Sequence, residues 1–106
     1  LTKIYKGSRK ETKALEDLNL QVSPNQIYGF LGPNGAGKTT TINLLLGLTA
    51  PTAGTAWVLE KQIGDIEIKR KIGFLPQSPY FYESFSSVEL LNFYGKIFKI
   101  HKKERY

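Results

Sequence analysis

The chain has 106 residues, of which 41% are hydrophobic and 12% aromatic, and this composition indicates a globular protein rather than a disordered one. It contains no cysteine, which excludes disulfides, and no apolar run approaches the roughly 20 residues that a membrane-spanning helix needs. The net charge of +6 is typical of a solvated surface, and it also suits binding to nucleotide phosphates or to a lipid headgroup surface. No recognition motif accompanies the charge, so we expect no specific nucleic-acid binding.

The first 22 residues have the pattern of an antiparallel ribbon. The stretch 1–6, L-T-K-I-Y-K, has strand character, and the polar residues 7–12 predict a hairpin loop. Two roles suit Tyr5, stacking on a nucleotide base or packing across the strands, and its spacing alone favours packing. Apolar residues then alternate with polar ones, as in a half-buried strand, at Leu18, Leu20 and Val22.

The stretch 27–41, I-Y-G-F-L-G-P-N-G-A-G-K-T-T-T, is the most informative in the chain. Its apolar part, 27–31, predicts a buried parallel strand. Gly32–Thr39 then matches G-x-x-x-x-G-K-[ST], a loop whose glycines adopt backbone angles barred to other residues. A helix that starts near Lys38 follows, with an apolar face that comprises Ile42, Leu45, Leu46 and Leu48.

This loop predicts phosphate binding, with a role for each residue. Successive backbone N–H groups hold the phosphate oxygens, and the positive end of the following helix adds to them; the residues concerned are Asn34, Gly35, Ala36 and Gly37. Lys38 reaches the β- and γ-phosphates, Thr39 binds Mg²⁺ through its hydroxyl, and Thr40 contacts the α-phosphate.

A second apolar run ends in a polar residue of interest. After a turn at 50–54, a short strand at 55–59 and a short helix within 65–71, the residues 72–75 predict another buried parallel strand beside the first. Gln77 follows it, at the end of the strand where α/β sheets bind ligands and where glutamines orient water in phosphoryl transfer. Taken alone, an exposed loop glutamine is the simpler interpretation of this residue.

Aromatic residues are concentrated in the loop 78–85. Four aromatics in eight residues are too many for a solvated connector, so they pack on the core or face a protein partner, and the sequence leaves these two alternatives even. Ser86 and Glu89 form a capping box, which predicts a helix with one apolar face at Leu90, Leu91, Tyr94, Ile97 and Phe98. His101, the lone histidine, lies in a basic tail and is expected to be solvated.

Several separated motifs together resemble the N-terminal half of an ABC transporter ATPase subunit. They are L-T-K-I-Y-K, A-L-E-D-L-N-L-Q-V, G-P-N-G-A-G-K-T-T-T-I-N-L-L-L-G-L, P-T-A-G-T and I-G-F-L-P-Q, in order and without large gaps. The resemblance implies an α/β fold: a P-loop NTPase core of parallel strands and helices, with an N-terminal antiparallel β subdomain. Residues 1–106 would then be the N-terminal part of one ABC-type ATP-binding domain, an incomplete domain.

The resemblance also implies a function and roles for the two open residues. It implies binding of ATP and Mg²⁺, and ATP hydrolysis in the complete protein, to drive transport of a substrate across a membrane. Tyr5 falls on the family's adenine-stacking aromatic, and Gln77 on the glutamine that contacts Mg²⁺ and the attacking water, so that Lys38 and Gln77 are the candidate catalytic residues. The partners implied are a transmembrane subunit or domain, in contact near Gln77 to Phe85, and a second ATP-binding subunit. The location implied is the cytoplasmic face of the cell membrane, as a peripheral protein.

Some of the family's motifs have no counterpart before Tyr106: its signature motif, its Walker B aspartate with the following glutamate, and its switch histidine. With no methionine at its start either, the chain is expected to be a fragment that binds nucleotide weakly and does not hydrolyse it alone. Glu60 also stands where many relatives have glycine, which predicts a different hairpin turn there. The alternatives are a soluble ABC-type ATPase of DNA repair or translation, and a nucleotide-binding fragment without turnover.

Overall fold

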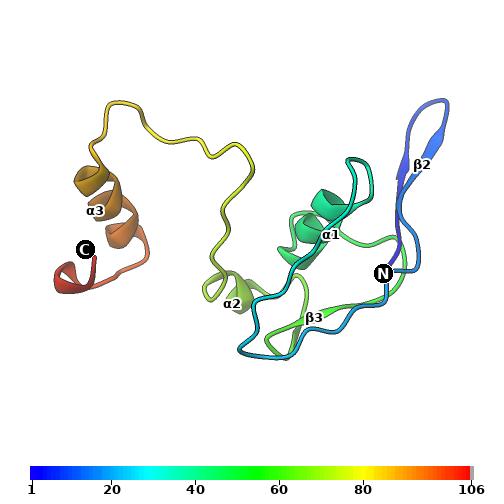
Figure 1. The fold of residues 1–106 in the computed structure, drawn as a ribbon, viewed down its shortest axis with the longest axis horizontal. Coiled ribbons are helices and arrows are strands. Elements are labelled where there is room, and N and C mark those ends of the chain that lie inside the picture. The colour runs from blue at the N-terminus through cyan, green and yellow to red at the C-terminus, as the bar shows by residue number, and fades with distance from the viewer. Residues whose placement is uncertain (106) are drawn as a thin grey trace. The chain divides into compact units, whose positions relative to one another are not determined.

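The computed structural model describes residues 1–105, which form two compact units. The first comprises Leu1–Gly73, and the second begins at Phe74. The first contains strands β1 (Lys3–Lys6) and β2 (Glu11–Leu15), helix α1 (Lys38–Leu45), strands β3 (Trp57–Val58) and β4 (Lys61–Gln62), and the short helix α2 (Ile66–Lys69) (Figure 1). The second contains helix α3 (Ser87–Ile97) and the 3₁₀ helix η1 (Lys102–Glu104).

The predicted N-terminal ribbon forms as an antiparallel hairpin. β1 pairs with β2, with Tyr5 opposite Thr12, and the turn between them is closed by the Gly7 N–H, which donates to the Lys10 carbonyl at 3.0 Å. A backbone bridge from Thr2 to Ala53 joins the start of this ribbon to the turn that follows α1. The expected antiparallel β element is therefore present and is attached to the rest of the first unit.

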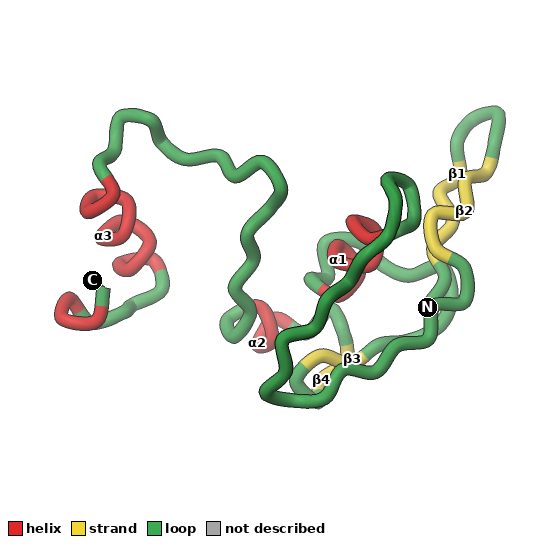
Figure 2. The backbone as a smooth tube through the Cα atoms, viewed as in Figure 1, coloured by secondary structure: helices red, strands yellow, loops and turns green. Residues whose placement is uncertain are grey.

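Three other strands that the sequence predicted are absent from the described residues. Residues 18–22, 27–31 and 72–75 form no strand, and Figure 2 draws these segments as loops. Ile27 is fully exposed and Leu31 is 92% exposed, so the strand predicted to be buried is not buried. A parallel strand gains its hydrogen bonds from neighbours on both edges, and the described residues place no strand beside 27–31.

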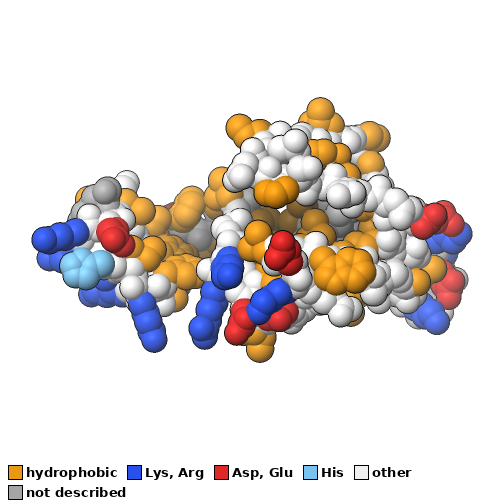
Figure 3. Space-filling model, turned by 90° about the horizontal axis from the view of Figure 1, so that it is seen from below, with side chains coloured by type: hydrophobic (Ala, Val, Ile, Leu, Met, Phe, Trp, Pro, Cys, Tyr) orange, Lys and Arg blue, Asp and Glu red, His pale blue; other side chains and the backbone are white. Residues whose placement is uncertain are grey.

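The core of the described chain is correspondingly small. Its buried apolar residues are Leu15 from β2, Leu44 from α1 and Ile68 from α2, with Thr41 as the buried polar residue. Many other apolar side chains lie at the surface, and orange atoms cover much of the face in Figure 3. The buried side chains of the first unit thus come from the ribbon, from α1, which contributes two, and from α2.

The turn between β3 and β4 has a conformation that glycine ordinarily adopts, although neither of its residues is glycine. β3 pairs with β4 through a two-residue loop in which Leu59 and Glu60 both have positive φ, at 50° and 66°. Such a loop ordinarily contains glycine, because positive φ brings Cβ close to the backbone. This finding agrees with the expectation of an unusual turn at Glu60.

Helix α3 begins with the predicted capping box. The Ser86 N–H donates to Glu89 Oε2 at 2.8 Å, and the Glu89 N–H donates to Ser86 Oγ at 3.4 Å. The Ser86 hydroxyl also donates to Glu89 Oε2, at 2.7 Å. This bond first, and the bond from the Ser86 N–H second, hold the pKa of the Glu89 carboxyl below its ordinary range. Beyond the helix, the Arg105 guanidinium Nε donates to the Ile100 carbonyl at 2.9 Å and crosses α3 at Gly95, where a Cβ would lie 2.6 Å from Arg105 Cδ.

Candidate nucleotide-binding site

The Gly32–Thr39 loop leads directly into helix α1. The Ala36 N–H donates to the Pro33 carbonyl at 3.1 Å, which closes a tight turn, and the helix starts at Lys38. Gly35 and Gly37 have φ of 85° and 92°, the left-handed region that favours glycine. Two of the three loop glycines, Gly35 and Gly37, thus adopt backbone angles that favour glycine, as the sequence predicted, and the predicted start of the helix is confirmed.

Lys38 folds back over its own loop. Its ammonium donates to the Gly32 carbonyl and, at 2.8 Å, to the Pro33 carbonyl. These bonds join the two ends of the loop into a ring, and the ammonium lies within the turn that the loop glycines form. The loop therefore holds the ammonium of the predicted phosphate-binding lysine beside its own backbone.

Gly37 fixes the loop against the N-terminal ribbon. A Cβ built on Gly37 would lie 2.7 Å from the Ala14 carbonyl oxygen and 3.2 Å from Leu15 Cδ1. A Cβ on Gly35 would meet nothing within 4 Å. Packing on β2 therefore requires glycine at position 37, whereas the Cβ position of Gly35 faces open space.

Thr41 anchors the first turn of α1, although the sequence did not single it out. Its hydroxyl donates to the Gly37 carbonyl at 2.8 Å and its N–H donates to the same oxygen at 2.9 Å. It is only 1% exposed, whereas Thr39 is exposed and Thr40 is half-buried. Only the run of three threonines in the sequence pointed to it. Of the two predicted ligand threonines, Thr39 is therefore the more accessible.

Tyr5 lies on the same ribbon that Gly37 contacts. It is 43% exposed, and the Lys3 ammonium lies 5.0 Å from the centre of its ring. Tyr5 pairs with Thr12 on β2, the strand whose Ala14 meets the loop. The structure thus connects the predicted base-stacking residue to the predicted phosphate loop through one hairpin.

The remaining predicted residues belong to the second unit. Gln77 is exposed in the loop 74–86, which belongs to the second unit. The aromatics of the loop divide into two sets. The ring centres of Tyr82 and Phe85 lie 5.7 Å and 5.8 Å from that of Phe93 on α3, whereas Tyr80 is 91% exposed. Packing therefore accounts for part of the aromatic content of this loop, but not for Tyr80.

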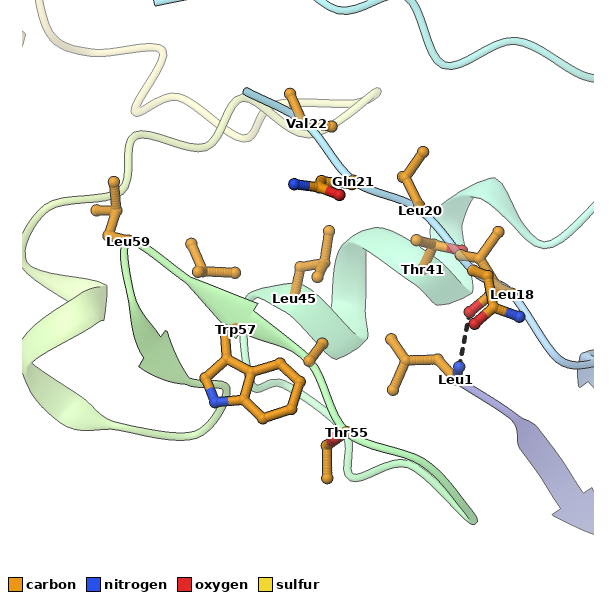
Figure 4. A pocket seen from close by; sticks show the side chains of 13 residues that line it. Leu1, Leu18, Leu20, Gln21, Val22, Thr41, Leu45, Thr55, Trp57 and Leu59 are labelled. Atoms are coloured by element: carbon orange, nitrogen blue, oxygen red, sulfur yellow. Dashed lines mark hydrogen bonds between the residues drawn. The ribbon is translucent and has the colours of Figure 1, made fainter. Parts of the chain in front are cut away.

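A separate cleft of about 720 Å³ lies between residues 18–22, α1 and β3. Figure 4 shows Leu20, Leu45 and Trp57 around it, and the Leu1 amino group donating to the Leu18 carbonyl at 2.7 Å near one end. Among the described residues that line it, none has a charged side chain and none belongs to the predicted phosphate site. The cleft is therefore a weaker candidate for a nucleotide than the loop with Lys38.

Comparison with known proteins identifies relatives over almost the whole chain. The profile of the ABC transporter family matches residues 15–105. The chain is 46% identical to the bacitracin transport ATP-binding protein BcrA of Bacillus licheniformis over 97% of the chain and 33% of that protein. It is 38% identical to an uncharacterized ABC transporter ATP-binding protein of Synechocystis over 99% of the chain and 30% of that protein.

A third relative, the Nod factor export ATP-binding protein I of Cupriavidus metallidurans, is 41% identical over 79% of the chain and 28% of that protein. The chain thus spans about a third of the length of these relatives. No solved structure matches it significantly. None of the helices within residues 1–105 combines the length and the apolar character that crossing a membrane requires.

Proposed function

Because the chain belongs to the ABC transporter family, we propose that it binds Mg·ATP through Gly32–Thr40 and forms part of an ATPase that drives transport. The observation that carries the proposal is the loop itself. The Lys38 ammonium joins the two ends of the loop, Gly35 and Gly37 have positive φ, and the loop leads directly into the N-terminus of α1. These are the features by which such a loop holds phosphates.

Each residue of the loop then has a definite task. The N–H groups of residues 34–37 hold phosphate oxygens, and Lys38 neutralises charge on the β- and γ-phosphates. Thr39 is the Mg²⁺ ligand, in keeping with its exposure at the helix start, and Thr40 is the contact to the α-phosphate. Bound Mg²⁺ supplies further charge neutralisation at the phosphates.

Tyr5 and Gln77 complete the proposed site. Tyr5 stacks on the adenine base, which its exposure and its position on the ribbon beside Gly37 support. Gln77 contacts Mg²⁺ and the attacking water in the complete protein, in which a second ATP-binding subunit shares the site. In the isolated 106-residue chain we expect binding without turnover, because no carboxylate base is among the proposed site residues.

The test is equilibrium binding of Mg·ATP to the chain, with Lys38→Ala and a matched control, Lys71→Ala, an exposed lysine of the same unit. Loss of a charge-assisted hydrogen bond costs about 1.5–3 kcal/mol, so Lys38→Ala should weaken binding by about 10- to 150-fold. The control should bind as the unmodified chain does. Equal affinity of the Lys38→Ala variant and the unmodified chain would refute the proposal.

We further propose that Gln77 to Phe85 contacts a transmembrane subunit or domain, which would place the protein at the cytoplasmic face of the membrane. The exposed Tyr80 supports this, since it lies outside the aromatic packing on Phe93. The chain has no cysteine, so Tyr80→Cys creates a unique cross-linking position, with Lys71→Cys as its control. In cells, Tyr80→Cys should cross-link to an integral membrane protein. Cross-links to soluble proteins alone would contradict this contact.

A further inference from the structure

Lys3 connects the base-stacking tyrosine to a distant turn. The Lys3 ammonium donates to the Ala50 carbonyl at 2.6 Å, across 47 positions of sequence, and lies 5.0 Å from the centre of the Tyr5 ring. A lysine side chain is flexible and ordinarily solvated. Here it is half-buried and held at one point by a backbone oxygen.

The backbone around Lys3 is fixed by the same turn. The Ile4 N–H donates to Thr52 Oγ1 at 3.0 Å, and the Thr52 N–H donates to the Thr2 carbonyl at 2.9 Å. These bonds hold β1 in place on the turn that follows α1. In addition to this backbone anchoring, the Lys3 ammonium contacts the Tyr5 ring itself.

The ribbon connects Tyr5 to the phosphate loop. β2 carries both Thr12, the partner of Tyr5, and Ala14, whose carbonyl oxygen would lie 2.7 Å from a Cβ on Gly37. A change in the position of the ring therefore alters the distance between a stacked base and the phosphates below it. A nucleotide bound at both points requires that distance to be correct.

We propose that Lys3 is a positioning residue for the nucleotide base. It occupies one face of the Tyr5 ring by a cation–π contact, which leaves the opposite face for the aromatic base of the nucleotide. The inference rests on the proposed function, because it presumes that the loop holds the phosphates. It adds to that function a residue, Lys3, that strengthens binding of the base. Binding of the phosphates does not depend on Lys3.

The test compares a ligand with a base and one without. Binding of Mg·ATP and of Mg·tripolyphosphate is measured for the chain and for Lys3→Ala, Lys3→Arg and Lys6→Ala. Lys6 also lies on β1 and is exposed, so its substitution removes the same charge without the contact to Tyr5. Lys3→Ala should weaken Mg·ATP about two- to fivefold, the range of an exposed cation–π contact. It should leave tripolyphosphate unchanged, while Lys3→Arg and Lys6→Ala bind both ligands normally.

A double substitution separates positioning from a general effect of charge. In a Tyr5→Ala background, Lys3→Ala should produce no further loss of Mg·ATP affinity, because it acts through the ring. A persistent loss there, an equal loss for both ligands, or no loss with Lys3→Ala alone would each overturn the inference while leaving the proposed function intact. If the unmodified chain bound neither ligand, the proposed function would fail, and the inference with it.

Discussion

Substitution of Gly37 by alanine tests how firmly the phosphate loop is attached to the ribbon. At φ of 92°, alanine pays about 1–2 kcal/mol for the left-handed conformation. Its Cβ would also lie 2.7 Å from the Ala14 carbonyl oxygen, a backbone atom that moves only with its strand. Overpacking of this kind costs about 1–3 kcal/mol. Alanine also lowers the conformational entropy of the unfolded chain, which stabilises the folded state by about 0.4–1 kcal/mol. We therefore expect a loss of about 3 kcal/mol from these opposing contributions.

Two other glycines separate the contributions. Gly35 has φ of 85° but nothing within 4 Å of its Cβ position. Gly35→Ala should therefore lower stability only through the conformational strain, by about 1 kcal/mol net. At Gly29 there is neither a positive φ nor a neighbour within 4 Å, and Gly29→Ala should be neutral or slightly stabilising. The expected order of stability is thus Gly29→Ala, then Gly35→Ala, then Gly37→Ala.

Hydrogen exchange at the Thr41 amide measures the effect where it occurs. This N–H donates to the Gly37 carbonyl at 2.9 Å, so it exchanges when the junction of loop and helix opens. A loss of about 3 kcal/mol corresponds to an exchange rate about 100-fold higher. If Gly37→Ala and Gly35→Ala accelerated the exchange equally, the contact with Ala14 would contribute nothing, and the reasoning would be refuted.

Two further predictions concern local conformation. Glu60→Gly should stabilise the β3–β4 hairpin by about 1 kcal/mol, because Glu60 has φ of 66°. The control, Glu83→Gly, replaces a residue without positive φ and should not be stabilising. Thermal unfolding compares the two variants, and equal effects on stability would contradict the turn assignment. Ser86 lowers the pKa of Glu89, so the stability that the Ser86–Glu89 cap gives to α3 is fully present above the ordinary carboxyl pKa. This stability is lost as pH falls through the lowered pKa. Circular dichroism should therefore show the helicity of α3 decreasing in that acid range, with the step missing in Glu89→Ala; an unchanged step would rule out this cap.

Features that depend on a few neighbouring residues were predictable from the sequence. The capping box at Ser86 and Glu89, the start of α1 at Lys38 and the positive φ of Gly35 and Gly37 all appear in the structure. Each is determined by contacts within about one turn of helix or loop, which the local pattern encodes. The β1–β2 hairpin also formed, because its two strands are adjacent in the chain and pair directly.

Strand predictions failed where pairing requires distant segments. An apolar run such as 27–31 indicates a strand of a parallel sheet, but it does not supply the strands on either side. Without them among the described residues, Ile27 and Leu31 remain at the surface. The anchoring roles of Lys3 and Thr41 were also not predictable, because each depends on which backbone oxygen lies near its side chain.

The phosphate loop retains its form although the strand before it does not. Lys38 bonds to carbonyls only five and six residues earlier, and Thr41 bonds to one four residues earlier, so the ring closes within a single short segment. Short loops close at low entropic cost, and neither bond needs a partner from a sheet. The proposed phosphate recognition therefore depends on local structure, whereas the proposed recognition of the base depends on a longer connection through Tyr5, Lys3 and the turn at Ala50. Perturbing that turn should thus weaken base recognition before it weakens phosphate binding.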